Sequence, residues 1–439
     1  METNNSTKVT SDLHEGWMEL SHEERKNAFR NFSRPDAEEL FLELSTPEQA
    51  KIISDLPSNE WRSWLRLLPP DDAADLIQEF SHEERPSLLN LLDSDTQSDV
   101  IALLTYAEDE AGGLMNPHFV RLKPDISVDV SLRYLRAQAR KQKETIHYAY
   151  VIGEGEILLG TVSFRDLLLA SSEKLISDIM TKELITIPEN MDQEEVSRKF
   201  SHHGLTAIPV VDDQHHMKGI VTVDDVVDVV EKETTEDMQK IGGMEALGAP
   251  YFQVGFLQII KKRAGWLTVL FLSEMFTATA MGYYEKEIQR AVVLALFIPL
   301  IISSGGNSGS QASTLIIRAM ALGEIKLRDW WKVFLRELSS GMVLGGILGS
   351  IGLIRILLWP SRHTLYGEHY VLVGLTVASS LVGIVLWGTL AGSMLPFILR
   401  KAGLDPATAS APFVATLVDV TGIIIYFTMA SLFLSGIML

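Results

Sequence analysis

The C-terminal stretch PFVATLVDVTGIIIYFTMASLFLSGIML, residues 412–439, decides the fold class of this chain. It is apolar and long enough to cross a bilayer as a helix, which takes about 20 residues. Asp419 is its one charged residue. Because a carboxylate inside a membrane helix costs a few kcal/mol or more, we expect Asp419 to face a water-filled path or a partner. A structural acid paired with a basic residue of a neighbouring helix is the alternative.

Four more apolar stretches precede this one, so we expect five spans, at residues 264–283, 288–317, 333–359, 371–399 and 412–438. Other charges fall in or near the ends of these stretches, at Glu274, Arg290 and Arg355. Lys and Arg gather at residues 261–263, in the connection at residues 318–332, and at residues 400–401. The positive-inside rule places these parts in the cytoplasm. It predicts a multi-pass protein of the plasma (inner) membrane, with cytoplasmic N-terminal domains and the C-terminus outside.

Charge divides the chain into two unlike halves. The net charge is −19, yet from Ala264 onward there are nine acids and eleven bases, which leaves 48 acids and 27 bases before it. We therefore expect an acidic soluble front, which repels nucleic acid and attracts cations, followed by a membrane domain. The absence of cysteine excludes disulfides and thiolate metal sites. The first 18 residues are polar, show no signal-peptide pattern, and are expected to be disordered.

A twelve-residue repeat fills the region from Leu20 to Leu92. An apolar residue recurs at Leu20, Phe32, Leu44, Leu56, Leu68, Phe80 and Leu92. Ser, Pro or Asp follows each, usually with an acid three residues further on, which is typical of a helix start. The pattern predicts a stack of short helices, either a packing scaffold or a domain with a chemical role.

Short strands and helices then alternate in two copies. The first contains a helix at 128–142 and a strand at 147–153, and the second a helix at 192–202 and a strand at 207–212. Each copy closes with the pattern G-x-x-[ST]-x-x-D, at Gly160, Ser163 and Asp166, and at Gly219, Thr222 and Asp225. This duplication resembles a tandem of CBS domains, named after cystathionine β-synthase. The resemblance implies a sensor of adenine nucleotides such as ATP. In that case Asp166 or Asp225 binds the ribose, and Tyr148 and Arg165 lie near the nucleotide. A structural pair without a ligand is the alternative.

Residues 224–247 predict a long helix that ends near Gly242-Gly243 and carries many acids. Like charges three and four residues apart repel one another, so this face is either solvated or neutralised by divalent cations. In the second span, the sequence GGNSGSQ (305–311) places Asn307 and Gln311 on one face, where their oxygens are available to an ion. Its glycines either loosen the helix or allow close helix packing.

Taken together, the chain resembles the MgtE family of magnesium channels and transporters over nearly its whole length. The most specific segments are GGNSGSQ (305–311) and DPATASAPFVATLVDVTG (405–422), supported by LRDWWKVFLRE (327–337). The expected fold class is multi-domain: an all-α helical-repeat N domain (19–112), α/β tandem CBS domains (113–175 and 176–230), a long connecting helix (231–260), and an α-helical polytopic membrane domain (261–439).

The resemblance further implies a homodimer with its pore on the two-fold axis, with Asp419 as the carboxylate that recognises Mg²⁺ and Ala415 one turn away. Regulatory magnesium sites, matched position by position, fall on Glu39, Asp71, Asp75, Asp192, Glu194, Asp225, Asp228, Glu233, Glu236 and Asp237. Two positions depart from the family pattern: Ala411 stands where some relatives carry Asn, and Gly204 replaces an acid.

We therefore expect Mg²⁺-selective transport into the cytosol through a dimeric pore, closed when Mg²⁺ binds the acidic domains. Transport of Mn²⁺, Co²⁺ or Ni²⁺, or a Mg²⁺ sensor without transport, are the alternatives. An enzyme is not expected, because the membrane half has no HExxH motif and its only histidines are His363 and His369.

Overall fold

The computed structural model describes residues 16–17, 20, 22–138, 148–249, 251–252 and 254–438. It divides into two compact units, Met1–Glu231 and Lys232–Leu439, which are described separately below. Most of the N-terminal segment that the sequence predicts to be disordered lies outside the described residues.

Short helices at the predicted spacing build the beginning of the first unit. They are α2 (His22–Asn31), α3 (Arg34–Glu43), α4 (Thr46–Asp55), α5 (Ser58–Leu65), α6 (Pro70–Gln78), α7 (Arg85–Leu89) and α8 (Ser94–Leu103). Ser33 and Asp93 accept hydrogen bonds from the backbone N–H three residues on, and thus cap α3 and α8. The repeated apolar residues point inward, with Leu44, Leu68 and Phe80 buried. The predicted stack of short helices is confirmed.

The two CBS copies repeat the same small sheet. In the first, β1 (Arg121–Leu122) pairs in parallel with β2 (Tyr148–Ile152), which pairs antiparallel with β3 (Leu158–Ser163). In the second, β4 (Ile187–Pro188), β5 (Ala207–Val211) and β6 (Met217–Thr222) pair in the same order. The irregularity after Val151 recurs after Val210, so the duplication extends to the detail of the register.

Helices flank both sheets: α9 (Ala111–Leu114), α10 (Val128–Gln138), η1 (Glu154–Glu156), α11 (Phe164–Leu169), α12 (Ile176–Ile179) and α13 (Gln193–His203). The predicted helix at 128–142 is found up to Gln138, and residues 139–147 lie outside the described part of the chain. The core of the helical stack continues into the second CBS copy through Val196 and Ile208, so these parts share one hydrophobic interior.

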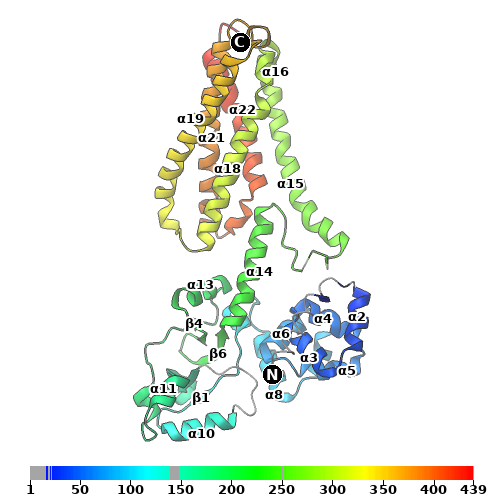
Figure 1. Ribbon diagram of the computed structural model, residues 1–439, viewed down its shortest axis with the longest axis vertical. Helices are drawn as coiled ribbons and strands as arrows, with labels where there is room; N and C mark the ends of the chain where they lie inside the picture. Colours follow the sequence, from blue (N-terminus) through cyan, green and yellow to red (C-terminus); the bar gives the residue numbers. More distant parts are fainter. Residues whose placement is uncertain are drawn as a thin grey trace. The chain divides into compact units, whose positions relative to one another are not determined.

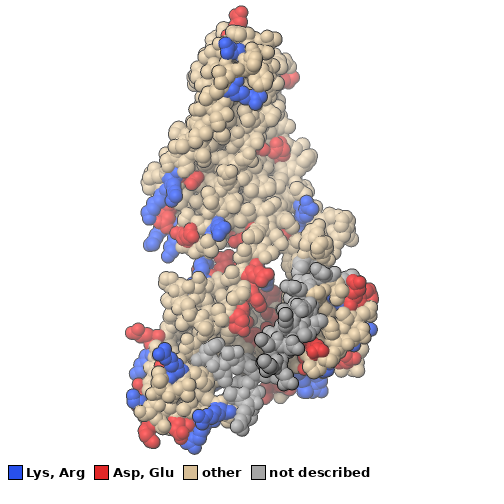
Figure 2. Space-filling model, viewed as in Figure 1, with Lys and Arg blue, Asp and Glu red and all other residues tan. Residues whose placement is uncertain are grey.

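The acidic helix α14 (Val223–Ile241) leaves the second CBS copy and ends before Gly242-Gly243, close to the end that the charge pattern predicts. The expected connecting helix over 231–260 is therefore too long, because α14 stops at Ile241 and the next helix begins only at Phe256. Gly243 has φ = +74°, a conformation that glycine adopts without strain and that ends the helix. Figure 2 shows Asp and Glu gathered along this helix.

Five helices of the second unit are long and apolar enough to cross a membrane. They contain α15 (Phe256–Tyr283), α18 (Ile298–Ala321), α19 (Trp330–Leu358), α21 (Tyr370–Lys401) and α22 (Ala411–Leu434), with the shorter α16 (Glu285–Arg290), α17 (Val292–Ala295), η2 (Leu327–Asp329), α20 (Arg362–Tyr366) and η3 (Pro406–Thr408) between them. Four of the long helices lie side by side and α15 stands against α22 (Figure 1). On the face that Figure 2 shows, the middle of these helices carries few charged side chains, as a lipid-facing surface requires.

The expected span at 288–317 is found, but its beginning is not part of one continuous helix. The chain breaks at Ala291 and Phe297, and α18 begins at Ile298 with Pro299 in its first turn. Proline lacks a backbone N–H and therefore suits the first turn of a helix but not its interior. The apolar pattern runs through this break, which is why the sequence does not show it.

The glycine run of α18 is helical throughout, so the expectation of a loosened helix is wrong and the packing alternative holds. A Cβ atom on Gly309 would lie 2.8 Å from Val414 Cγ1 of α22 and 3.0 Å from the Gly388 carbonyl oxygen of α21. Glycine at this position therefore lets the backbone of α18 approach the backbone of α21 and the Val414 side chain of α22.

Candidate functional site

Asp419 lies on α22, whose start is fixed by local sequence. The Ser410 hydroxyl accepts a hydrogen bond from the Phe413 backbone N–H at 3.3 Å, and Pro412 occupies the first turn. Both signals favour a helix that begins at this point. The helix places Ala415 one turn before Asp419 on the same face, and both side chains are half-buried.

Gly306 of α18 faces this pair. A Cβ atom on Gly306 would lie 3.3 Å from Ala415 Cβ and 3.6 Å from Asp419 Oδ1. Because glycine carries no side chain, α18 leaves room beside the carboxylate at this point. The structure thus brings together the two most specific sequence segments, GGNSGSQ and the segment that contains Asp419.

Glu274 is a second carboxylate within a long apolar helix, and the expectation that it lies near the end of its span is wrong. It lies well inside α15 rather than near an end, it is exposed, and α15 packs against α22, the helix that carries Asp419. Arg290 and Arg355, by contrast, do lie in the last turns of α16 and α19. A carboxylate in the interior of an apolar span is a signal that the sequence alone contains.

Asn307 and Gln311 share the exposed face of α18, as their spacing predicts. The Asn307 side-chain amide donates to Ser303 Oγ at 3.3 Å. Within the described part of the chain neither amide hydrogen bonds to Asp419, so the two amides and the carboxylate are separate groups along these helices.

In the first unit, α6 and α14 bring acids together. Asp71 is buried, its Oδ1 accepts a hydrogen bond from Asn116 Nδ2 at 3.3 Å, and burial and the charges of Asp72 and Asp225 raise its pKa well above the usual value. Burial also raises the pKa of Asp225 to about 7, although hydrogen bonds from Thr222, including one from Oγ1 at 2.6 Å, oppose the shift. A cation placed here would relieve this repulsion.

A second acidic group, in the other unit, joins the end of α14 to the loop before α22. Lys240 Nζ donates to Asp405 Oδ2 at 2.7 Å and also pairs with Glu236. Burial raises the pKa of Asp237 to about 6, and Asp405, Glu233 and Glu236 act in the same direction. Asp405 is a member of this group that the predicted site list lacked, although it stands in the characteristic segment 405–422.

The remaining predicted metal residues are dispersed. Asp192 caps α13 by accepting from the Glu194 N–H at 2.9 Å, and Glu194 pairs with Arg198 at 3.5 Å. Glu39 and Asp75 are exposed on α3 and α6, and burial raises the pKa of Asp228. Across the described residues, no three or more His, Asp or Glu side chains form a group that could hold a metal ion.

The predicted nucleotide residues lie at the start of α11. Tyr148 stands opposite Ser163 in the sheet, and the Ser163 hydroxyl donates to Asp166 Oδ2 at 2.6 Å and accepts from the Asp166 N–H at 3.1 Å. Arg165, between them in sequence, is exposed. The second copy repeats the turn with Thr222 and Asp225.

Comparison with known protein families gives three matches along the chain. Residues 10–109 match the MgtE intracellular N domain, residues 111–173 and 176–232 match the CBS domain, and residues 298–429 match MgtE, a divalent cation transporter. Together they span the soluble and membrane parts of the chain.

The chain is also similar to individual proteins of known description. The chain is 39% identical over 429 residues to the magnesium transporter MgtE of Thermus thermophilus, covering 97% of this chain and 93% of that protein. It is 30% identical over 420 residues to the magnesium transporter MgtE of Bacillus subtilis, covering 95% and 90%. A solved structure of the cytosolic domain of the Mg²⁺ channel MgtE in complex with ATP is 38% identical, with a TM-score of 0.47, over 50% of this chain and 90% of that one.

Proposed function

The chain belongs to the MgtE family, and from this premise we propose that it transports Mg²⁺ across the plasma membrane into the cytosol along a path beside Asp419. The observation that carries the proposal is a half-buried carboxylate on an apolar span, with the glycine run of α18 beside it and a second carboxylate, Glu274, on the neighbouring helix α15. Transport of another divalent cation, Mn²⁺, Co²⁺ or Ni²⁺, is the alternative. A transporter is proposed here rather than an enzyme.

The chemistry of Mg²⁺ suits such a site. The ion prefers oxygen ligands, demands near-octahedral geometry and gives up its water reluctantly. A carboxylate therefore serves by holding a largely hydrated ion through its water, and a full cage of protein ligands is not needed. We propose Asn307, Gln311 and Ala415 as further residues that line the path.

We propose that two copies enclose the path. Only 6% of the most apolar window of α15 is buried within one chain, and Glu274 is exposed on this helix. A charged residue exposed to lipid is costly, so a second copy or a water-filled path must cover it. Five spans place the C-terminus at the end opposite the start of α15 (Figure 1), and we propose that this end is outside.

Regulation by Mg²⁺ follows from the acidic groups. We propose that cytosolic Mg²⁺ binds among Asp71, Asp225 and Asp228, and near Glu233, Glu236 and Asp237, with Glu39, Asp75, Asp192 and Glu194 completing sites between domains or copies. Repulsion among the buried carboxylates favours a looser arrangement without the ion. Binding must be tighter in the closed state for Mg²⁺ to close the path.

We propose in addition that an adenine nucleotide such as ATP binds the first CBS copy. In this proposal Tyr148 contacts the base, Arg165 the phosphates and Asp166 the ribose; Tyr148 lies opposite Ser163, whose hydroxyl binds Asp166 at the start of α11. An empty, purely structural pair is the alternative, and isothermal titration of the full chain with ATP decides between them.

The test of transport is Mg²⁺ uptake into proteoliposomes by the intact chain and by Asp419→Asn, which keeps the shape and removes the charge. Glu337→Gln, a matched neutralisation of a half-buried carboxylate on α19, is the control. We expect loss of flux with Asp419→Asn and retention with Glu337→Gln. Equal flux in the intact chain and in Asp419→Asn would refute the role of Asp419, and the absence of flux from the intact chain would favour a sensor. Repeating the assay with Mn²⁺, Co²⁺ and Ni²⁺ tests the alternative ions.

A further inference from the structure

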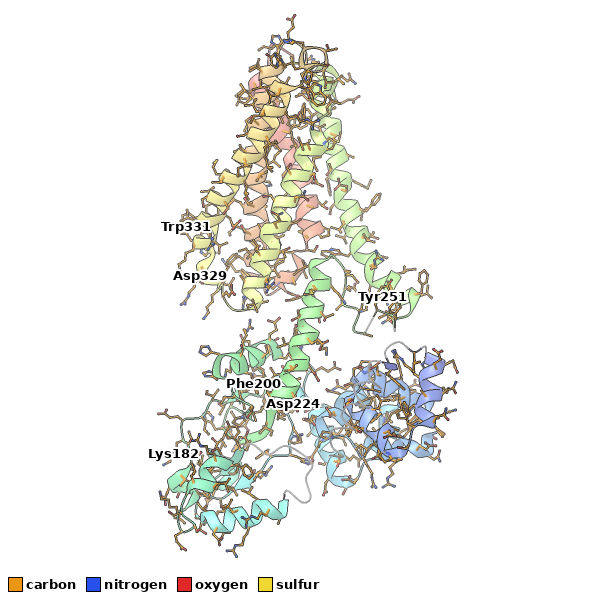
Figure 3. All side chains as sticks on the ribbon, viewed as in Figure 1. Lys182, Phe200, Asp224, Tyr251, Asp329 and Trp331 are labelled. Carbon is orange, nitrogen blue, oxygen red and sulfur yellow. The ribbon has the colours of Figure 1, made fainter. Side chains whose placement is uncertain are left out.

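The segment that leads into α15 exposes aromatic side chains. Tyr251 is 65% exposed, Phe252 98% and Phe256 76%, and the rings of Tyr251 and Phe252 meet edge to face at 5.5 Å. Tyr251 lies at the edge of its unit, away from the bundle of long helices (Figure 3). Neighbouring aromatic side chains left uncovered in this way mark an interaction surface.

Positive charge follows directly on the same segment. Lys261 and Arg263 are exposed and form no ion pair within the part of the chain that the structure describes, whereas Lys262 donates to the Ala246 carbonyl. Two of the three basic side chains are thus available to an external anion. The segment 251–263 therefore combines exposed aromatic rings with exposed cations at the start of a span.

A second segment, residues 326–332, has the same composition. Trp330 and Trp331 are about half exposed, and Lys326, Arg328 and Lys332 are exposed, with Lys332 paired to Asp329 at 3.0 Å. Figure 3 shows Trp331 and Asp329 at the outer edge of α19, and Figure 2 shows Lys and Arg gathered there. Because α15 and α19 run in the same direction, both segments lie at the same end of the long helices (Figure 1).

We propose that segments 251–263 and 326–332 bind anionic phospholipid headgroups at the membrane face where α15 and α19 begin. Tyr and Trp favour the headgroup level because one part of each ring system is apolar and the other polar. Lys and Arg beside a span are attracted to an anionic leaflet, and each such charge increases the binding constant about fivefold. Both segments are continuous with membrane spans, so lipid is the neighbour whose charge and polarity complement them.

This contact also reaches the connecting helix. The Glu245 backbone N–H donates to the Lys262 carbonyl at 3.2 Å, and the Lys262 side chain binds the carbonyl of Ala246. A lipid-bound segment 251–263 therefore holds the turn that follows α14 at the membrane face. The binding itself does not depend on the proposed transport of Mg²⁺.

The experiment uses the full chain, whose lack of cysteine makes Phe252→Cys a unique labelling position. A bimane fluorophore is attached there, and the protein is reconstituted into vesicles that contain an equal fraction of brominated phosphatidylglycerol or brominated phosphatidylcholine. We expect stronger quenching by the anionic lipid. The binding constant of the anionic lipid relative to phosphatidylcholine should fall about fivefold with Arg263→Gln, and further when Lys261→Gln is added.

Two variants isolate the cause. Lys123→Gln with Lys174→Gln removes two exposed charges of the first unit and should leave the lipid preference unchanged. The double variant Lys261→Arg with Arg263→Lys keeps both charges and should also retain the preference for the anionic lipid. The proposal is overturned if the two lipids quench the intact chain equally, or if the doubly neutralised variant keeps the lipid preference. It is also overturned if bimane reports an apolar environment but is not quenched, because a second copy of the chain would then cover the segment.

Discussion

Replacing Gly309 by alanine tests the close approach of α18 to α21 and α22. The added methyl group would lie 2.8 Å from Val414 Cγ1 and 3.0 Å from the Gly388 carbonyl oxygen. Carbon–carbon contacts are most favourable at about 3.5–4.0 Å, so the methyl group is too close to Val414 Cγ1 by roughly 0.5–1 Å, and it also presses on the Gly388 oxygen. Overpacking of this kind costs about 1–3 kcal/mol. Alanine favours a helix over glycine by about 1 kcal/mol, so the net loss is about 0–2 kcal/mol.

Gly346→Ala in α19 is the matched control, because no atom outside its own helix lies within 4 Å of the new methyl group. It carries the same gain in helix propensity without the clash, so the two variants should differ by about 1–3 kcal/mol. The assay is thermal unfolding of the purified full chain, in which 1 kcal/mol corresponds to about 2–4 °C for a unit of 150–250 residues. Equal unfolding temperatures, or a higher one for Gly309→Ala, would refute the packing argument.

Three further predictions follow. Phe41→Ala removes a fully buried ring from the helical stack, so urea titration followed by tryptophan fluorescence should show a loss of about 3–5 kcal/mol in the free energy of unfolding. Asp71→Asn removes a charge that repels Asp225, so thermal melts should show higher stability without Mg²⁺ and a smaller gain when Mg²⁺ is added. Glu274→Gln removes a negative charge from α15, the helix beside Asp419 on α22, so uptake into liposomes should need a severalfold higher Mg²⁺ concentration for half-saturation while maximal flux is kept.

Each of these has a neighbouring control. Leu42→Ala, at an exposed position beside Phe41, should change the free energy of unfolding little, and a comparable loss would contradict the predicted core. Asp95→Asn, which changes an exposed acid of α8, should leave the stability gain on adding Mg²⁺ unchanged. If Asp71→Asn also leaves this gain unchanged, Asp71 does not contribute to the proposed Mg²⁺ site. Glu285→Gln, at the start of α16, should not alter the Mg²⁺ concentration for half-saturation. If Glu274→Gln gives the same concentration as Glu285→Gln, Glu274 has no part in transport.

Local signals made much of the fold predictable. The twelve-residue spacing and the caps at Ser33 and Asp93 act within one turn of a helix, so the short helices of the N domain could be placed from sequence. The long apolar stretches are equally self-contained. The start of α18 was missed because the residues around Ala291 continue the apolar pattern, and only Pro299 indicated where the helix begins.

The candidate sites depend on tertiary contacts, which the sequence alone does not specify. Asp71 and Asp225 were each selected through the family resemblance, but their mutual repulsion arises from the packing of α6 against the start of α14. The pairing of Lys240 with Asp405 likewise joins positions far apart in the chain. Glu274 differs, because its place within an apolar span could have been recognised from the sequence.

The glycine contacts restrict which helices can move. Gly309 meets Gly388, and Gly345 and Gly349 of α19 lie against the backbone of α21 at Val382 and Ala378. Backbone-to-backbone contacts have no flexible side chains to absorb sliding or rotation, so we expect α18, α19 and α21 to move together. By contrast, α15 packs chiefly against α22, and its glycines make no such backbone contact with a neighbouring helix, so we expect α15 to shift more easily than the other long helices.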